Sequence, residues 1–243
     1  MRFANLVVAN SCAGLEAWRI GPKKGRVVHN AFDSGRLCAT RSEDTLTSAT
    51  AERFTVVMTS RMAPPKDFLT VIRAARILTS GYSSDWRFVL VGAGVDRPRL
   101  LSEASDLVAA GVVEFPLADL DVMDHVRRAH VGVLMSDPSV LAEGCPNSIM
   151  EYMACGLPVV CADSGGCREL VRDGDNGYVI PPRDAAALAG RLALLRRHPE
   201  VRARFGSVGK ARVEQEFTVS GMVAHYVRLY EEVLAGPCDR ART

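Results

Sequence analysis

Short apolar runs alternate with longer stretches of helical period along most of this chain, and this alternation is its most restrictive feature. Runs such as FTVVM, FVLV and PVVCA are continuously apolar, as strands are when helices cover both faces of a sheet. Strand followed by helix, repeated, indicates a parallel sheet with crossover helices. The sequence therefore predicts an α/β protein with a doubly wound, Rossmann-like parallel sheet. The predicted strands are 54–59, 87–91, 112–115, 131–135, 158–162 and 177–180.

Helical periodicity fills the gaps between these strands, and both ends of the chain carry further elements. Helices are predicted at 67–79, 98–110, 123–129, 147–155, 185–197, 200–214 and 219–234. Near the start, two more strands at 6–9 and 26–29 flank a short helix at 12–18. Residues 36–53 are polar and short of large apolar side chains, which indicates a connector. The last residues, 236–243, are expected to form a disordered tail.

The helix at 219–234 has a wide apolar stripe along one side. The stripe consists of Met222, Val223, Tyr226, Val227, Tyr230, Val233 and Leu234, which recur at helical spacing. A terminal helix with such a stripe needs a second surface to cover it. We therefore expect this helix to pack against something outside the main sheet.

Composition excludes several classes of protein. The 243 residues are 48% hydrophobic and 24% charged, which is ordinary globular usage and rules out disordered and coiled-coil chains. A net charge of +2 without a long basic run argues against a nucleic-acid partner. No segment reaches the roughly 18 apolar residues that cross a bilayer. Seven scattered Cys residues without a CxxC pair favour reduced thiols over disulfides or a zinc site, so a cytoplasmic protein without a metal site is expected.

Candidate site residues follow the strands, because ligands of open α/β sheets bind beyond the carboxyl ends of the strands. The strand at 54–59 is followed by SRMAPPK, in which Arg61 and Lys66 lie on a proline-stiffened loop. Two cations there suit a diphosphate, although by themselves they also fit a pair of solvated surface cations. Gly92 and Gly94 follow the next strand and allow a tight turn, but the third glycine of the dinucleotide fingerprint is missing. A nicotinamide cofactor is therefore not expected.

The segment EGCPNSIMEYMACGLP, at 143–158, carries the most chemical information. Pro146 suits the first position of a helix, which would leave the next three amides free at the helix start, where phosphates commonly bind. Glu151 lies one turn down on the same face, and Glu143 lies in the loop above. Carboxylates on both sides of a phosphate suggest a ligand with hydroxyl groups on both sides, whereas the spacing alone also fits two unrelated glutamates.

One more strand end contributes to the same edge of the predicted sheet. Gly165 and Gly166 follow the strand at 158–162 and are expected to let the backbone approach a ligand, and Glu169 follows them in a short helix. Successive strand ends thus offer glycines and polar groups to one edge, which strengthens the prediction of a single binding site.

Together these strings resemble the donor-binding half of the retaining glycosyltransferases of family 4, whose GT-B fold has two Rossmann-like domains facing each other across a cleft. EGCPNSIMEYMACGLPVV resembles the family signature, in which seven residues separate two Glu and a Gly-x-Pro follows. SRMAPPK resembles the Arg and Lys loop of the family, VGAG its glycine turn, and SGGCRELVRDGDNGYVIPP the segment after the signature. LVVANS and VVHNAFD resemble the end of the first domain and the crossover between the domains.

The resemblance implies a division of the chain, with most of the N-terminal acceptor domain absent. In this division, 1–35 is a remnant of that domain and the crossover, and 36–53 is the polar connector. The nucleotide-sugar-binding domain is 54–216, the C-terminal half of a GT-B fold. The helix at 217–235 packs toward the missing domain, and 236–243 is the tail.

The resemblance also implies roles for individual residues. Arg61 and Lys66 would hold the diphosphate and stabilise the charge that develops as the sugar–phosphate bond breaks, and Glu143 would lie beside the donor sugar. Glu151 would accept hydrogen bonds from the ribose. The substrate-binding residues implied are Gly92, Gly144, Cys145, Pro146, Asn147, Ser148, Ile149 and Glu151. The family works with retention and usually without a metal, so no cofactor is expected. The expected donor is a UDP-, GDP- or ADP-linked sugar.

Two functions remain open from the sequence. In the first, the chain is the catalytic donor half of a glycosyltransferase, and an acceptor-domain partner brings the site for a glycan, lipid or small molecule. In the second, it is a nucleotide-sugar-binding module or truncated remnant that transfers nothing by itself. Ser60 departs from the glycine that the family usually has, and nothing in the chain matches the family's acceptor-domain residues. The expected location is the cytoplasm, with peripheral attachment to the inner membrane face as an alternative.

Overall fold

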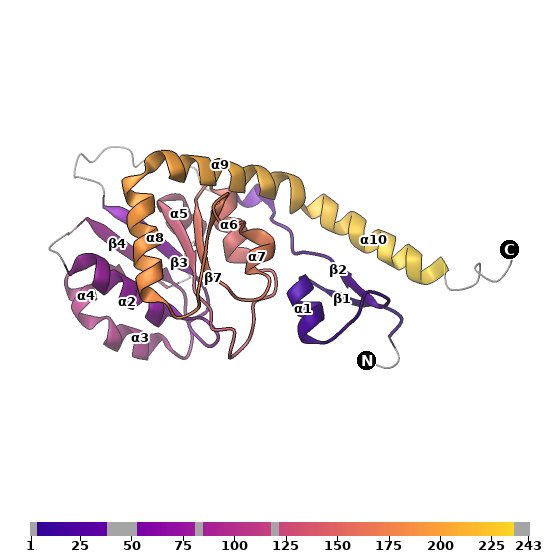
Figure 1. Cartoon of the computed structure of the whole chain (residues 1–243), viewed down its shortest axis with the longest axis horizontal. Coiled ribbons are helices and arrows are strands. Elements are labelled where there is room, and N and C mark those ends of the chain that lie inside the picture. Colours follow the sequence, from indigo (N-terminus) through magenta and orange to yellow (C-terminus); the bar gives the residue numbers. More distant parts are fainter. Residues whose placement is uncertain (1–3, 38–52, 81–84, 118–121, 236–243) are drawn as a thin grey trace.

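The structure is a computed structural model that describes residues 4–37, 53–80, 85–117 and 122–235. Parallel strands form its main sheet in the order β5-β4-β3-β6-β7-β8 (Figure 1). They are β3 (Phe54–Thr59), β4 (Trp86–Val91), β5 (Val113–Glu114), β6 (Val131–Leu134), β7 (Val159–Ala162) and β8 (Gly177–Ile180). The predicted doubly wound α/β fold is confirmed, and every predicted strand of this sheet begins and ends within one residue of its expected position.

Helices connect the strands and cover the sheet. The long ones are α2 (Phe68–Thr79), α6 (Asn147–Ala154), α8 (Ala185–Arg197) and α9 (Pro199–Glu216). α2 packs against α8, and α6 packs against α9. The shorter ones are α3 (Arg97–Glu103), α4 (Ser105–Ala109), α5 (Val122–Arg127) and α7 (Cys167–Leu170). The single helix predicted at 98–110 is divided in two, because the backbone of Ala104 (φ −106°, ψ 11°) leaves the helical range.

The core lies between the sheet and these helices. Every residue of β3, β6 and β7 is buried, which explains why their sequences are continuously apolar. The largest fully buried side chain is Tyr152 of α6. Its ring occupies the space beside Gly132 of β6, where a Cβ atom would lie 2.3 Å from the ring. Gly132 therefore makes room for the tyrosine.

The direction of winding reverses between β3 and β6. The chain passes from β3 outward to β5, then returns to β6 and continues outward to β8. Such a reversal leaves a crevice at the carboxyl ends of the strands. Beside the ladder between the two strands, the Tyr152 hydroxyl accepts a 2.7 Å hydrogen bond from the Thr59 amide at the end of β3. The fold thus predicts that a ligand site opens next to Thr59.

A small unit precedes the main sheet, as predicted. Its parallel strands β1 (Val7–Ala9) and β2 (Gly25–Val27) are joined by α1 (Cys12–Ala17). A 3-10 turn, η1 (Ser34–Leu37), follows. The rest of the predicted connector (36–53), apart from Arg53, lies outside the described residues, and so does the predicted tail at 236–243.

The last helix, α10 (Val219–Ala235), extends beyond the main sheet and runs beside the small unit (Figure 1). Arg26 of β2 and Glu232 of α10 form an ion pair with an N–O distance of 2.5 Å. The predicted apolar stripe lies mostly on another side of α10 and is largely exposed, up to 69% for Tyr230 and 84% for Leu234. Among the described residues, no helix combines the length and the apolar character needed to span a membrane.

Candidate functional site

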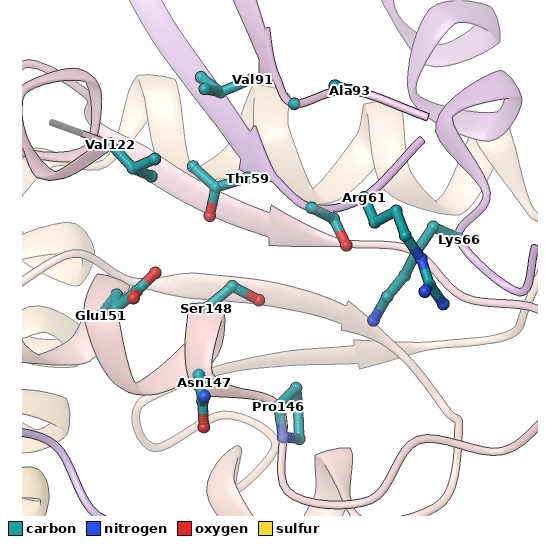
Figure 2. A pocket seen from close by; sticks show the side chains of 12 residues that line it. Thr59, Arg61, Lys66, Val91, Ala93, Val122, Pro146, Asn147, Ser148 and Glu151 are labelled. Atoms are coloured by element: carbon teal, nitrogen blue, oxygen red, sulfur yellow. The ribbon is translucent and has the colours of Figure 1, made fainter. Parts of the chain in front are cut away.

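A cleft of about 490 Å³ opens at the carboxyl edge of the sheet, beside the reversal between β3 and β6 (Figure 2). The loops after β3 and β4 form one wall, and the start of α6 forms the other. The predicted residues that line it are Arg61, Lys66, Gly92, Pro146, Asn147, Ser148 and Glu151. The structure therefore brings together the cations, the glycine turn and the helix start that the sequence singled out.

The first wall is built by backbone hydrogen bonds between the loops after β3 and β4. The Ser60 amide donates to the Val91 carbonyl at 3.1 Å, and the Met62 amide donates to the Ala93 carbonyl at 2.8 Å. Gly92 has a φ of +151°, and a Cβ atom there would lie 2.0 Å from the Ser60 carbonyl oxygen. Only glycine fits this backbone, so Gly92 lets the two loops approach each other while it lines the cleft.

Lys66 is held in place by the neighbouring strand. The Asp67 amide donates to the Met135 carbonyl at 3.0 Å, and the Asp137 amide donates to the Pro65 carbonyl at 2.8 Å. These two bonds fix the loop opposite the end of β6, with Lys66 paired to Ser136. The position of the lysine is therefore set by backbone on both sides.

The side chain of Lys66 forms an ion pair with Glu143. Its Nζ atom donates to Oε1 of Glu143, and the same oxygen accepts a hydrogen bond from the Ser136 hydroxyl. The two charged side chains are only 17% and 10% exposed. Glu143 thus stands behind Lys66, in contact with it, and is not among the residues that line the cleft.

Two glycines after β7 hold the Glu143 loop. A Cβ atom on Gly165 would lie 2.1 Å from the Glu143 carbonyl oxygen, and one on Gly166 would lie 1.9 Å from the Gly144 carbonyl oxygen. The Gly166 amide also donates to the Glu143 carbonyl at 2.9 Å. The expectation that these glycines admit a ligand is wrong, because the protein's own backbone fills the space.

The second wall is the start of α6, where the structure differs from the prediction in two details. Pro146 is the residue before the helix (φ −73°, ψ 116°), not its first residue. The Ile149 amide bonds to the Pro146 carbonyl at 3.2 Å, and the Ile149 side chain is fully buried, so Ile149 does not reach the cleft. The amides of Asn147 and Ser148 find no acceptor among the described residues. They remain available for an anion at this helix start.

Deeper in the cleft, Glu151 lies one turn down α6 and is 9% exposed (Figure 2). Next to it, burial raises the pKa of the Tyr152 phenol, which stays neutral at ordinary pH. This hydroxyl bonds to the amide and the hydroxyl group of Thr59, which lines the cleft. The floor of the cleft is therefore fixed from below by one buried phenol.

Gly144 and Cys145 were also predicted to bind substrate, but in the structure they contact the small N-terminal unit. A Cβ atom on Gly144 would lie 2.6 Å from the Asn10 side-chain oxygen. The Cys145 carbonyl accepts a 2.9 Å hydrogen bond from Asn30. Burial raises the pKa of the Cys145 thiol to about 11, so it is neutral near pH 7 and unsuited to act as a nucleophile.

Several cleft residues were not predicted. They are Thr59, Ser60, Val91, Ala93 and Val122. Most of them directly end or follow β3 and β4, so the rule that ligands lie beyond strand ends contains the signal for them. Ser136, which bonds Glu143, and Asn30, which bonds the start of α6, act behind the cleft and leave no signal of that kind.

The arrangement suits an elongated ligand with an anionic part and a hydroxyl-rich part. Arg61 and Lys66 lie toward one end of the cleft, and Glu151 lies toward the other (Figure 2). Arg61 is exposed and has no ion-pair partner within the part of the chain that the structure describes. Cations and free helix amides attract phosphate oxygens, and a buried carboxylate accepts hydrogen bonds from hydroxyl groups.

Comparison of the sequence with known proteins identifies the family of this chain. The sequence profile described as glycosyl transferases group 1 matches residues 53–198, which include both walls of the cleft. The chain belongs to this family. A phosphatidyl-myo-inositol mannosyltransferase of Mycobacterium leprae is 29% identical over 74% of the chain, and a D-inositol 3-phosphate glycosyltransferase of Acidothermus cellulolyticus is 32% identical over 70%.

The chain is shorter than these glycosyltransferase relatives. The matched parts cover 46% and 40% of the two relatives, so the chain spans about half the length of the curated proteins it matches. Among solved structures, Anabaena Alr3699/HepE in complex with UDP-glucose has a TM-score of 0.80 and 24% identity, over 95% of this chain and 65% of that one. This likeness confirms the GT-B type of Rossmann-like fold.

Proposed function

We propose that this chain is the donor-binding and catalytic half of a retaining glycosyltransferase of family 4, the C-terminal half of a GT-B fold. It takes a sugar from a UDP-, GDP- or ADP-linked donor and passes it to a glycan, lipid or small molecule. The observation that carries this proposal is the shared cleft of Arg61, Lys66, the α6 start and Glu151. The UDP-glucose named for the HepE structure is a molecule of the kind that such a cleft fits.

In this proposal the diphosphate lies between the cations and the start of α6. Negative charge grows on the diphosphate as the bond from the anomeric carbon to the phosphate oxygen breaks. Arg61, Lys66 and the amides of Asn147 and Ser148 stabilise that charge, which lowers the barrier because the stabilisation is greatest in the transition state. Positive charge from side chains and helix amides serves the diphosphate without a metal ion, so we propose no cofactor.

The two carboxylates have different tasks. Glu151, one turn deeper, accepts hydrogen bonds from the ribose hydroxyls. Glu143 contacts Lys66 and lies near the donor sugar, where it orients the lysine and accepts from sugar hydroxyls. When the diphosphate arrives, Lys66 shares its three donors between Glu143 and phosphate oxygens.

We also propose that the acceptor site belongs to a second half. In this division, 1–35 is the end of an acceptor domain with the crossover, 36–53 a connector, 54–216 the donor domain and 217–235 a helix that packs on the acceptor domain. The relatives' greater length and the exposed stripe of α10 support this reading. We place the chain in the cytoplasm, where nucleotide sugars serve as donors.

The experiment is a thermal-shift and calorimetry panel of the chain against UDP, GDP, ADP and their sugars. A ligand at a hundred times its Kd stabilises a protein by about 2.7 kcal/mol, which for this length raises the midpoint by roughly 5–10 °C. We expect a selective shift with one nucleotide base. A cooperatively folded sample that responds to none of these ligands would contradict donor binding.

Binding without transfer is the second outcome to resolve. A chain that binds one nucleotide sugar, yet transfers nothing when an acceptor-domain chain is supplied, would be a nucleotide-sugar-binding module. Product analysis by mass spectrometry, with and without that second chain, separates the two functions.

A further inference from the structure

Asn30 lies on the start of α6 although more than a hundred positions separate the two in the sequence. It follows β2, in the segment that leads out of the small N-terminal unit. Its side-chain nitrogen Nδ2 lies 2.9 Å from the Cys145 carbonyl oxygen and 2.9 Å from Oδ1 of Asn147. Asn147 lines the cleft, so the segment before the donor domain contacts a binding residue directly.

The chemistry of the three groups fixes the orientation of both amides. A backbone carbonyl only accepts hydrogen bonds, so the atom of Asn30 that faces Cys145 has to be the nitrogen. The same nitrogen faces Asn147, so the atom of Asn147 that meets it has to be the oxygen. The Asn147 nitrogen is then directed away from Asn30.

The Asn147 nitrogen is left for a ligand, because Asn147 lines the cleft and its oxygen is bonded to Asn30. In Figure 2 the oxygen of Asn147 points away from Ser148 and Glu151, and the nitrogen lies closer to them. Within the described residues this nitrogen has no hydrogen-bond acceptor. Two N–H donors beside the free amides of the helix start are suited to phosphate oxygens.

We infer that Asn30 is a positioning residue for the donor site, which holds the Asn147 amide so that its N–H groups point at the diphosphate. This inference rests on the proposed function. Without Asn30 the amide turns freely and presents its oxygen part of the time, and an oxygen repels phosphate. The unit ahead of the donor domain would thereby set the affinity of the donor site.

The segment that carries Asn30 is anchored independently of this side chain. The Phe32 amide donates to the Phe217 carbonyl at 2.9 Å, and His29 contacts the Glu169 carboxylate at 2.8 Å. Removal of the Asn30 amide should therefore leave the backbone in place. His29 provides a matched control, because it is the neighbouring residue and contacts α7 instead of α6.

Calorimetry first identifies which of UDP, GDP and ADP the wild type binds most tightly. The test is then a double-mutant cycle on the Kd of that nucleoside diphosphate. Asn30→Ala should weaken binding about tenfold to a hundredfold, the range for a hydrogen bond to a charged group. In an Asn147→Ala background, Asn30→Ala should raise the Kd less than twofold. His29→Gln should change Kd less than twofold, and binding of the matching nucleoside should be unchanged throughout.

A second variant keeps the test decisive if Asn30→Ala does not fold. Asn30→Asp offers only acceptors, so Asn147 has to turn its nitrogen toward residue 30 and its oxygen toward the cleft. It should weaken binding more than Asn30→Ala does. The part of the loss that comes from the turned amide should vanish in the Asn147→Ala background, which leaves only the repulsion between the new carboxylate and the diphosphate. An equal loss in both backgrounds would overturn the inference alone. A wild type that binds no nucleoside diphosphate would overturn the proposed function, and the inference with it.

Discussion

The helices α6 and α10 are both amphipathic, but only α6 has its apolar side covered. In α6, an eight-residue helix, every residue from Ile149 to Ala154 is buried, including Glu151. In α10, a helix of 17 residues, no residue is buried. The apolar residues of α6 pack on β6, β7 and α9, whereas the stripe of α10 has no such neighbour among the described residues.

This difference corresponds to different roles: α6 forms part of the cleft, whereas α10 has an exposed apolar surface. Burial fixes α6 in one orientation, so the free amides at its start and the carboxylate of Glu151 point into the cleft with little freedom to move. The ion pair between Arg26 and Glu232 ties α10 to the small unit at its polar side, which leaves the stripe facing outward. An exposed row of large apolar side chains of this kind marks an interaction surface.

The largest predicted effect is on the free energy of unfolding, when one carboxylate is introduced on α6 and, for comparison, one on α10. Met153→Asp puts a carboxylate in the fully buried face of α6 and should destabilise the fold by about 4 kcal/mol or more, enough to unfold a marginal domain. Val227→Asp, on the exposed stripe of α10, should change the free energy of unfolding by about 0.5 kcal/mol or less. Urea denaturation followed by circular dichroism measures both. A comparable loss in Val227→Asp would mean that the stripe is already covered.

The next prediction concerns the charged side chains Lys66 and Glu143 at the cleft beside α6. In the proposed function Lys66 contacts the diphosphate, so Lys66→Ala should lower nucleoside diphosphate affinity about tenfold to a hundredfold. Glu143→Gln removes the competitor for Lys66, so the diphosphate without its sugar should bind as tightly as before or more tightly, while transfer falls. Calorimetry with the diphosphate and with the nucleoside separates these effects. Loss of nucleoside affinity in Lys66→Ala would instead indicate damage to the whole cleft.

The sequence predicts the fold well because the sheet depends on a repeated local pattern. Short continuous apolar runs bounded by turns are typical of strands covered on both faces, and β3 begins and ends at its predicted residues. β8 does so as well. The division of the helix at Ala104 was not predictable, since Ala favours helix and its type gives no signal of a break.

The cleft was predictable only in part, because some of its contacts join segments that are far apart in the sequence. Arg61, Lys66 and Glu151 follow strands or share a helical face, so their positions could be inferred. The ion pair of Lys66 with Glu143 joins segments 77 positions apart, and no spacing rule reports it. Gly165 carried the right signal, a need for close approach, but a sequence cannot say whether a ligand or the chain itself comes close.

A third prediction concerns the deep end of the cleft. In the proposed function Glu151 accepts hydrogen bonds from the ribose hydroxyls, so Glu151→Ala should weaken nucleoside and nucleoside diphosphate binding alike, about fivefold to tenfold. Glu214→Ala, an exposed glutamate on α9, is the matched control and should leave both affinities unchanged. Competition assays with a ribonucleoside and its 2′-deoxy analogue measure the contribution of the hydroxyl. A diphosphate-specific loss in Glu151→Ala would move this carboxylate away from the ribose.

The smallest expected effect lies at the junction of the small unit with the main sheet. Burial alone would raise the pKa of Glu169, but hydrogen bonds from the amides of Cys12 and Ala13 and from His29 outweigh it and lower the pKa below its usual 4.5. A carboxylate whose pKa is lower in the folded state stabilises that state above its usual pKa. This stabilisation is lost as the pH falls through the lowered value.

Stability should therefore decline more steeply in the wild type than in Glu169→Gln when the pH falls from about 6 to about 3. The difference should be about 0.5–1 kcal/mol, the usual size of a carboxylate interaction with a helix start. Urea midpoints over this pH series measure it, with Glu214→Gln as the control that should follow the wild type. Parallel curves for the wild type and Glu169→Gln would show that this contact does not couple the small unit to the fold.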